Sequence, residues 1–136
     1  MLALILLYDQ ITRTLHRGTP RAFAWDAHAR SLTQQAIARG FDQALFPVER
    51  LFVYMPLMHS ESLADHDRAV ELFAALVSCA PEGTDCHEAL VGNLRSEHLH
   101  RDIIVQFGRY PHRNALLGRA STEEERAFLE QPGSSF

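Results

Sequence analysis

The chain contains no lysine, so all 13 of its basic residues are arginine. Arginine stays charged at every physiological pH, and its planar guanidinium can pair with a carboxylate or a phosphate through two parallel hydrogen bonds. The formal net charge is -4, which excludes a general attraction to nucleic acid or to an anionic membrane surface. The arginine bias therefore favours, slightly, a local site for an anion.

Cysteines and long apolar runs are also scarce. Cys79 and Cys86 bracket the segment Ala-Pro-Glu-Gly-Thr-Asp, a spacing that fits neither a zinc site nor a redox pair, so we expect free thiols unless the chain is exported. The apolar run from Leu2 to Tyr8 is too short to span a membrane, and no basic residues precede it. We therefore expect a soluble protein of the cytoplasm.

Several catalytic signatures are missing. The sequence has no Gly-rich phosphate loop, no cysteine-nucleophile signature, no Gly-x-Ser-x-Gly elbow and no His-Glu-x-x-His zinc motif. A mixed metal shell of His59, Glu61, Asp65 and His100 is an alternative, provided that the fold brings their helices together. Because this arrangement is the less favoured one, we expect no metal and no cofactor.

Helical periodicity covers most of the chain, and no convincing alternating strand pattern interrupts it. The length of 136 residues fits one domain. We therefore predict an all-α fold, with a single domain over 1–136 that forms an irregular antiparallel bundle of about six helices. The expected helices cover 2–16, 26–39, 47–58, 63–77 and 85–106, followed by a short helical turn at 113–117 and a last helix that begins after 121–124 and ends near 130.

Capping residues, glycines and prolines mark the ends of these helices. Gly40 should close the second helix, and Pro47 should begin the third, which Pro56 must kink or end. The predicted capping residues are Asp26 for the second helix, Ser62 with Asp65 for the fourth, and Ser121 with Glu124 for the last.

One stretch has the spacing of a tetratricopeptide repeat. Ala69, Phe73 and Pro81 stand where such a repeat places its second helix and its closing proline. We therefore expect tetratricopeptide-like helical hairpins within the bundle.

The loops rich in Arg and His should meet at one end of the bundle. Short connections favour antiparallel neighbours, so successive helices alternate in direction. Gly18, Met58 and Gly108 then lie at one end, and Gly40 and Ala80 at the other. We call the first end the pole and define it by the loops 17–21, 59–61 and 108–114. Helix amino termini at the pole would also attract anions.

The predicted function is the binding of an anionic ligand or an acidic peptide segment at the pole, without chemistry. The alternative is that these arginines pair with nearby carboxylates and only hold the loops together. The predicted ligand-binding residues are Arg17, Arg21, His59, Glu61, Arg109, His112, Arg113 and Asn114.

A small-molecule enzyme of hydrolytic type is the second function that fits the sequence. Such an enzyme would use His59, Glu61 and His112 for acid–base chemistry at the same pole. The absence of a recognisable nucleophile or metal motif favours the binding function over this one.

Four further charged residues are expected to act in structure. Arg101 and Asp102 lie beside Ile103 in the fifth helix and should form a charge pair near the core, so that Asp102→Ala lowers the melting temperature before it alters any binding. Asp9 and Arg13 in the first helix are assigned the same kind of role.

Several longer motifs carry a family resemblance. They are Asp9-Gln10 with Arg13, the segment 17–24, Met58-His-Ser-Glu61, Leu63-Ala-Asp65 and the run 100–136, above all Phe107-Gly-Arg-Tyr-Pro-His-Arg-Asn114. With these motifs, nearly the whole chain resembles DUF924, a bacterial family of unknown function in the tetratricopeptide-like helical superfamily. The resemblance implies a helical-hairpin fold and no established activity, substrate or catalytic residue.

The chain departs from the family pattern in two places. Ile11-Thr12-Arg13-Thr14 stands where Phe-Pro-Arg-Asn is expected, so Thr14 replaces the asparagine. Members usually have a further amino-terminal helical region, and the resemblance implies that this chain lacks it. We therefore expect an exposed apolar face on the first helix, through which the protein could form an oligomer.

Overall fold

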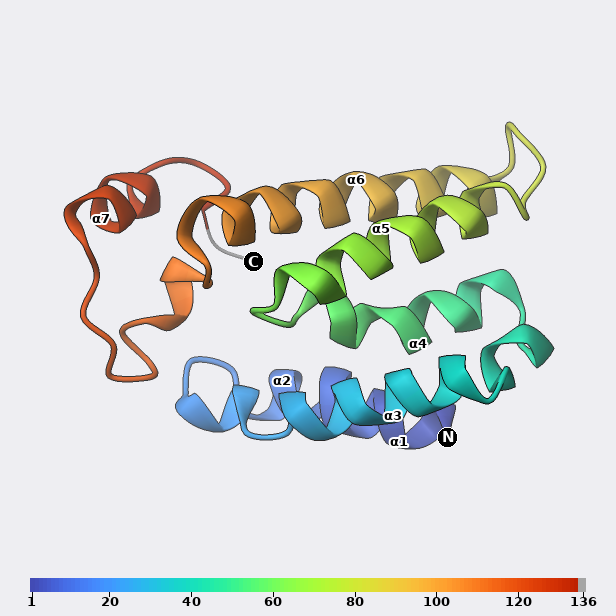
Figure 1. Ribbon diagram of the computed structural model, residues 1–136, viewed down its shortest axis with the longest axis horizontal. Coiled ribbons are helices and arrows are strands. Elements are labelled where there is room, and N and C mark those ends of the chain that lie inside the picture. Colours follow the sequence, from blue (N-terminus) through green and yellow to red (C-terminus); the bar gives the residue numbers. More distant parts are fainter. Residues whose placement is uncertain (135–136) are drawn as a thin grey trace.

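A computed structural model describes residues 1–134, and this part of the chain contains helices and turns but no β-strand (Figure 1). The all-α prediction is confirmed. The elements are α1 Leu2–Ile5, a π-helical segment Leu6–Ile11, α2 Thr12–Leu15, a 3-10 turn Pro20–Phe23, α3 Asp26–Ala38, a 3-10 turn Phe41–Ala44, α4 Pro47–Met58, α5 Leu63–Val77, α6 Asp85–Phe107, a 3-10 turn Pro111–Arg113 and α7 Glu123–Leu129.

The helices alternate in direction as predicted. Figure 1 shows α3 and α5 leaving the pole and α4 and α6 returning to it, so that the loops after α2, α4 and α6 meet at one end. α5 packs against both α4 and α6. Gly40 and Gly108 end their helices with φ values of 67° and 68°, a left-handed conformation that glycine adopts without steric cost.

The amino-terminal helix contains a feature that its periodicity did not predict. Between α1 and α2 the backbone forms a π-helical segment, in which each turn is wider than in an α-helix. The hydroxyl groups of Thr12 and Thr14 donate to the carbonyl oxygens of Tyr8 and Gln10, at 2.5 and 3.0 Å. Asp9 lies in the middle of this segment and is buried. Such segments occur often at functional sites.

Two predicted capping interactions do not form, because the side chains have other partners. The N-cap residue of α3 is Trp25, and Asp26 pairs with Arg13 instead. At α5, Ser62 is the N-cap residue as predicted, but its side chain makes no capping hydrogen bond, and Asp65 accepts a hydrogen bond from the hydroxyl of Ser60.

α4 covers 47–58 as predicted, and the start of α7 differs from its predicted form. Pro56 has no N–H to donate within α4, and the helix ends two residues after it, at Met58. The capping box of the last helix lies one residue later than predicted and consists of Thr122 and Glu125.

The main core lies between the amino-terminal helix and α3 to α6. It contains fully buried large side chains such as Tyr54, Leu57, Phe73 and Leu76. Burial of each such side chain stabilises the fold by about 1.5 to 3 kcal/mol. A second small cluster joins Ile103, Ile104 and Tyr110 with the partly buried Phe107 and Phe128. This second cluster holds the carboxy-terminal segment against α6 and so completes the pole.

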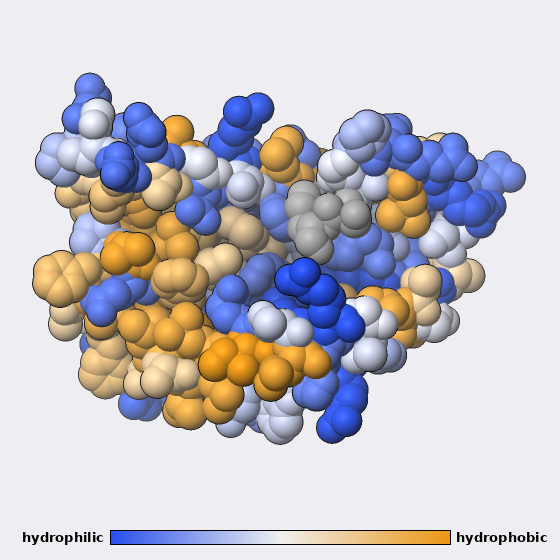
Figure 2. Space-filling model, turned by 180° about the vertical axis from the view of Figure 1, so that it is seen from behind, coloured by the Kyte–Doolittle hydropathy of each residue, from blue (hydrophilic) through white to orange (hydrophobic). Residues whose placement is uncertain are grey.

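The first helix leaves an apolar stripe exposed, as expected. Leu4, Leu7, Ile11 and Leu15 are 42% to 72% exposed. Figure 2 shows apolar residues gathered on the face opposite to the one drawn in Figure 1. That this stripe joins the protein to another copy stays a prediction.

Candidate functional site

A cavity of about 440 Å³ opens at the pole between the end of the amino-terminal helix, the start of α3 and the turn that follows α6. Its wall brings together residues that are far apart in the sequence, and it holds three arginines and three histidines. The lining residues are Gln10, Arg13, Thr14, Arg17, Gly18, Ala22, Phe23, Met55, His59, His100, Tyr110, His112, Arg113 and Leu116. Of the eight predicted ligand-binding residues, the cavity contains Arg17, His59, His112 and Arg113.

His59 of the cavity wall makes a close polar contact with Asp9. The Nδ1 atom of His59 lies 2.6 Å from Oδ1 of Asp9. Burial alone would raise the pKa of Asp9, but His59 and Arg13 together lower it. Burial lowers the pKa of His59, and the positive charges of Arg13 and Arg113 lower it further. The attraction to Asp9 raises the pKa but does not cancel these effects. At neutral pH the pair therefore consists of a carboxylate and an uncharged imidazole.

Asp26 connects two of the cavity arginines. Its carboxylate lies 2.8 Å from Nη2 of Arg13 and 3.3 Å from Nη1 of Arg113. This bridge ties the amino-terminal helix, α3 and the turn after α6 together. Arg13 was predicted to be structural, and it does brace these elements, but it also lines the cavity.

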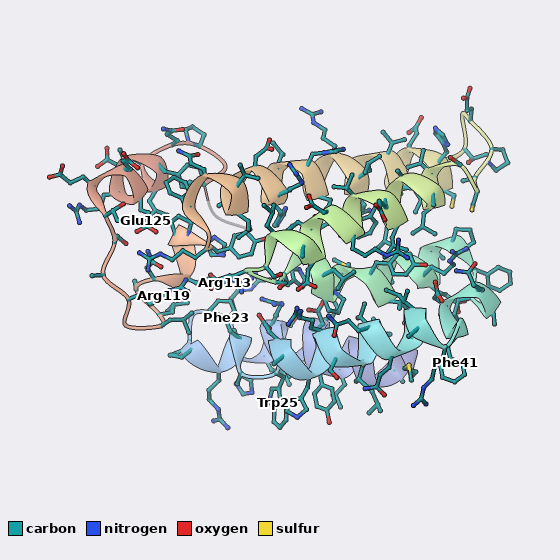
Figure 3. All side chains as sticks on the ribbon, viewed as in Figure 1. Phe23, Trp25, Phe41, Arg113, Arg119 and Glu125 are labelled. Atoms are coloured by element: carbon teal, nitrogen blue, oxygen red, sulfur yellow. The ribbon has the colours of Figure 1, made fainter. Side chains whose placement is uncertain are left out.

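Arg113 is held between two aromatic rings. Its guanidinium carbon lies 4.7 Å from the ring centre of Phe23 and 4.4 Å from that of Tyr110, distances at which cation–π attraction operates. Its Nη2 donates to the carbonyl oxygen of His59 at 2.9 Å. Only 6% of Arg113 is exposed. Figure 3 shows Arg113 beside Phe23 at the end of the bundle.

The other two histidines of the cavity are also uncharged near neutral pH. Burial lowers the pKa of His100 and of His112 to about 4 in each case. His100 contacts the carbonyl oxygen of Ser96 through Nδ1 at 2.7 Å, so this nitrogen carries the proton. The lasting positive charge of the wall therefore comes from its arginines.

A buried polar cluster, which no sequence motif predicts, lies next to the cavity and supports it. His66 and Glu97 are fully buried, with Nδ1 of His66 2.7 Å from Oε1 of Glu97. The Nε2 atom of His66 lies 2.8 Å from the carbonyl oxygen of Ser60. Tyr110 donates its hydroxyl hydrogen to the carbonyl oxygen of Met58 at 2.5 Å. These contacts fix the loop after α4, and burial raises the pKa of Glu97.

Glu61, Arg109 and Asn114 were predicted to bind ligand, and the structure places them outside the cavity in a network that braces the carboxy-terminal segment. Arg109 donates to both oxygens of Glu125, at 2.6 and 2.8 Å, and Asn114 also contacts Glu125. Arg119 donates to both oxygens of Glu61, at 2.7 and 2.9 Å. These carboxylates already use the charge of the arginines that face them.

Arg119 and Glu125 were not predicted from the sequence as residues of the pole, although Glu125 has a local sequence signal. Glu125 stands three residues after Thr122, which is the spacing of a capping box. A capping glutamate that is only 2% exposed needs a cation, because a buried carboxylate without a partner is costly. Arg119 carries no comparable local pattern. Figure 3 shows both residues on the carboxy-terminal segment, farther from the bundle than Arg113.

The remaining predicted residues lie elsewhere. Arg21 is exposed on the turn 20–23 and does not line the cavity. Arg101 pairs with Asp67 at 2.8 Å on the surface, and Asp102 is exposed. The predicted charge pair of Arg101 and Asp102 near the core is therefore wrong, because the two residues project from the solvent side of α6.

The alternative metal shell finds no support in residues 1–134, where no group of three or more His, Cys, Asp or Glu side chains could hold an ion. Glu61 is occupied by Arg119, and Asp65 is occupied by Arg30 and Ser60. Within the same residues, no helix is long and apolar enough to cross a membrane.

Comparison with known proteins gives a family and a structural relative. The model of the family described as "Bacterial protein of unknown function (DUF924)" matches residues 1–133. A protein of unknown function from Agrobacterium tumefaciens, whose structure is solved, is 42% identical to this chain, with a TM-score of 0.81. The likeness covers 95% of this chain and 66% of the Agrobacterium protein. No curated protein matches the chain.

Proposed function

Because the chain belongs to the DUF924 family, whose description names no activity, we propose from the geometry alone that it binds a small molecule with an anionic group in the cavity at the pole. The observation that carries this proposal is the charge of the wall. Three arginines line the cavity, and no carboxylate of residues 1–134 does. Asp9 and Asp26 do not line the cavity, but they pair with Arg13 and Arg113 and hold them in place.

Arg17 gives the site its uncompensated charge. Arg13 and Arg113 share the carboxylates of Asp9 and Asp26, so these four charges balance. Arg17 is exposed, lines the cavity and makes no ion pair with any carboxylate of the described part of the chain. A carboxylate or phosphate of the ligand would supply the missing partner, because both match the fork of a guanidinium.

The shape of the site favours a small molecule over an acidic peptide. A volume of about 440 Å³ lies in the usual range of small-molecule sites, roughly 300 to 1,000 Å³. Phe23, Met55 and Leu116 add apolar surface to the wall. The ligand class is therefore a compact molecule with an apolar part and an anionic group.

We also propose the cytoplasm as the place of action and tetratricopeptide-like packing for the hairpins. Cys79 and Cys86 are exposed free thiols, which persist in a reducing compartment. The packing of α5 against both α4 and α6 is the kind of contact that helical hairpins make.

The proposal can be tested by titrating the protein with sodium phosphate and recording amide NMR shifts. We expect saturable shifts at Gly18 and His112, which line the cavity, and at Gly108, which begins the loop that contains His112. Arg17→Gln should weaken binding by about tenfold, because one charge-assisted pair is lost. Arg39→Gln is the matched control, since Arg39 is also exposed and unpaired among residues 1–134 but follows α3 at the opposite end.

Two outcomes would contradict the proposal. One is the absence of saturable shifts near the cavity in the wild type. The other is equal binding by the Arg17 and Arg39 variants. Measurements at two concentrations of NaCl add a check, because contacts of the exposed Arg17 should weaken as salt screens its charge.

A further inference from the structure

We propose that His59 is a general base that activates water in this cavity for the hydrolysis of a carboxylic ester whose molecule also carries a separate anionic group. The inference rests on the proposed function, because the cavity arginines hold the anionic group and so place the ester next to the imidazole. Asp9 is the positioning residue that fixes the orientation of His59.

The contact between His59 and Asp9 determines which ring nitrogen carries the proton. Asp9 is 1% exposed and ionised, and an ionised carboxylate can only accept hydrogen bonds. The Nδ1 atom of His59 is therefore the donor, over 2.6 Å. Its Nε2 atom is left with a lone pair and has no hydrogen-bond partner among residues 1–134, while the ring lines the cavity. A nitrogen in this state can accept a proton from water.

Water is the nucleophile that the cavity leaves available. Among residues 1–134, no serine or cysteine lines the cavity, and the two hydroxyl groups that do line it have other partners. The hydroxyl of Thr14 donates to the carbonyl oxygen of Gln10, and that of Tyr110 donates to the carbonyl oxygen of Met58. The chemistry therefore needs no covalent intermediate on the protein.

The charged surroundings keep His59 available as a base at neutral pH. Burial lowers its pKa, and so do the two nearest arginines, against the attraction of Asp9. A ring that is uncharged before the reaction can take up the proton, and Asp9 then stabilises the imidazolium that forms. The titratable and charged groups that face His59 are Asp9 and Arg13 from the amino-terminal helix, Asp26 from α3, His100 from α6, and Arg113 and His112 from the turn after α6.

The hydrolytic step balances without a further reactant. Nε2 of His59 takes one proton from water, and the hydroxide oxygen forms a bond to the acyl carbon. The tetrahedral intermediate collapses, and the bond between the acyl carbon and the alcohol oxygen breaks. The imidazolium returns its proton to the leaving oxygen, which gives an acid and an alcohol. An acyl carbon suits this base better than a phosphate monoester, whose negative charge repels hydroxide.

A purely structural role for the His59–Asp9 contact explains less. Asp26 already joins the amino-terminal helix to the pole through Arg13 and Arg113. A brace also needs neither a second ring nitrogen at a cavity nor the π-helical segment that surrounds Asp9. Both features are expected where a carboxylate orients a catalytic imidazole.

The test uses 4-acetoxybenzoate, an aryl ester with a separate carboxylate, and phenyl acetate as its uncharged counterpart. We expect the wild type to hydrolyse 4-acetoxybenzoate with saturation and with a kcat/KM at least tenfold above that for phenyl acetate. His59→Gln should lower kcat by about 100-fold or more, the usual contribution of a general base. His98→Gln, at an exposed histidine of α6, is the control and should leave the rate unchanged.

The pH profile tests Asp9 separately from its effect on stability. In the wild type, kcat should rise with pH through one titration below the usual histidine value of 6.5. Asp9→Asn removes the attraction that opposes this shift, so the profile should move to lower pH while kcat falls. A merely structural Asp9 would change the amount of folded protein, which thermal melting reports, but would not move the profile.

The outcomes separate this inference from the proposed function. If His59→Gln hydrolyses 4-acetoxybenzoate as fast as the wild type, or if the wild type does not exceed the rate in buffer, the general base is refuted. Should phosphate still bind with the expected dependence on Arg17, the anion site stands without chemistry. If phosphate does not bind either, both proposals fail. The wild-type profile and the comparison of the two esters decide the matter even if a variant does not fold.

Discussion

Two groups of arginines lie at the same pole, and they differ in how completely their charge is used. Arg109 and Arg119 each face one carboxylate and hold both of its oxygens, in the network of the carboxy-terminal segment. Arg13 and Arg113 share the carboxylates of Asp9 and Asp26, and Arg17 has no ion pair within residues 1–134. The first group braces the fold, whereas the second retains, through Arg17, capacity for an external anion.

The comparison shows that internal partners, rather than the arginines themselves, separate a brace from a binding site. Arg109 and Arg113 stand four residues apart in the loop 108–114, and no local sequence pattern distinguishes them. Their roles differ because Glu125 reaches Arg109 from α7, while Asp26 reaches Arg113 from α3 and must also serve Arg13. Both partners come from distant parts of the chain.

Loss of Arg113 should have the largest effect on stability. Arg113→Ala removes a buried cation from two aromatic rings and from Asp26 and the carbonyl of His59. Because Asp26 keeps Arg13, we expect a loss of about 2 to 3 kcal/mol in the free energy of unfolding, below the full cost of breaking a buried pair. Urea denaturation measures it, with the exposed Arg95→Ala as the control. Wild-type stability would show that Arg113 is not needed to hold the pole together.

Glu61→Gln should separate stability from binding. The carboxylate of Glu61 accepts two hydrogen bonds from Arg119 and one from the backbone N–H of Tyr110. Replacing it by the uncharged amide should cost about 1 to 2 kcal/mol of stability. Phosphate binding should not change, because Glu61 lies outside the cavity. A folded Glu61→Gln protein that no longer binds phosphate would return this residue to the site.

The ion pair of Arg109 and Glu125 should make the stability of the protein depend on pH in a specific way. Arg109 holds the pKa of Glu125 down to about 2, from a usual value of 4.5. A group whose pKa is depressed on folding stabilises the protein above its unfolded pKa, and this contribution is lost as pH falls through the folded one. The stability difference between wild type and Glu125→Gln should therefore be constant above pH 4.5 and shrink between pH 4.5 and 2. A difference that stays constant down to pH 2 would contradict the ion pair.

The smallest effect is expected at α6, where the sequence had predicted a large one. Asp102 is exposed, and an exposed substitution of this kind usually changes stability by less than about 0.5 kcal/mol. Asp102→Ala should therefore melt like the wild type. A clear loss of stability would show that Asp102 makes a stabilising interaction despite its exposed position.

Much of the fold could be predicted from the sequence, because apolar periodicity and helix-ending residues are local signals. Gly40, Gly108 and Pro47 marked helix ends correctly. Short connections then implied alternating directions and hence a common pole. The caps at Asp26 and Ser62 could not be predicted in the same way, because each depended on competition with a partner that is distant or outside the helix.

The site could be predicted only in part. Arg17, His59, His112 and Arg113 stand in loops that the alternation rule brings together, and these four do line the cavity. Arg13 lies within a helix, where periodicity predicts only a structural role. The sequence does not reveal the π-helical segment that precedes Arg13, nor that this residue lines the cavity.

The partition of charged partners is likewise a tertiary property. The placement of α3, α7 and the loop after α4 determines which arginine each carboxylate reaches. It therefore also determines that Arg17 forms no ion pair within residues 1–134. No spacing within the pole encodes this.

The central claim is that the arginines of the cavity, and not Arg109 and Arg119, accept an external anion. Crystals of the wild type soaked in sodium selenate, whose selenium scatters anomalously, would locate a tetrahedral anion directly. We predict an anomalous peak inside the cavity within hydrogen-bond distance of Arg17, and none beside Arg109 or Arg119. A peak beside Arg109 or Arg119, together with an empty cavity, would contradict the roles proposed for the two groups of arginines.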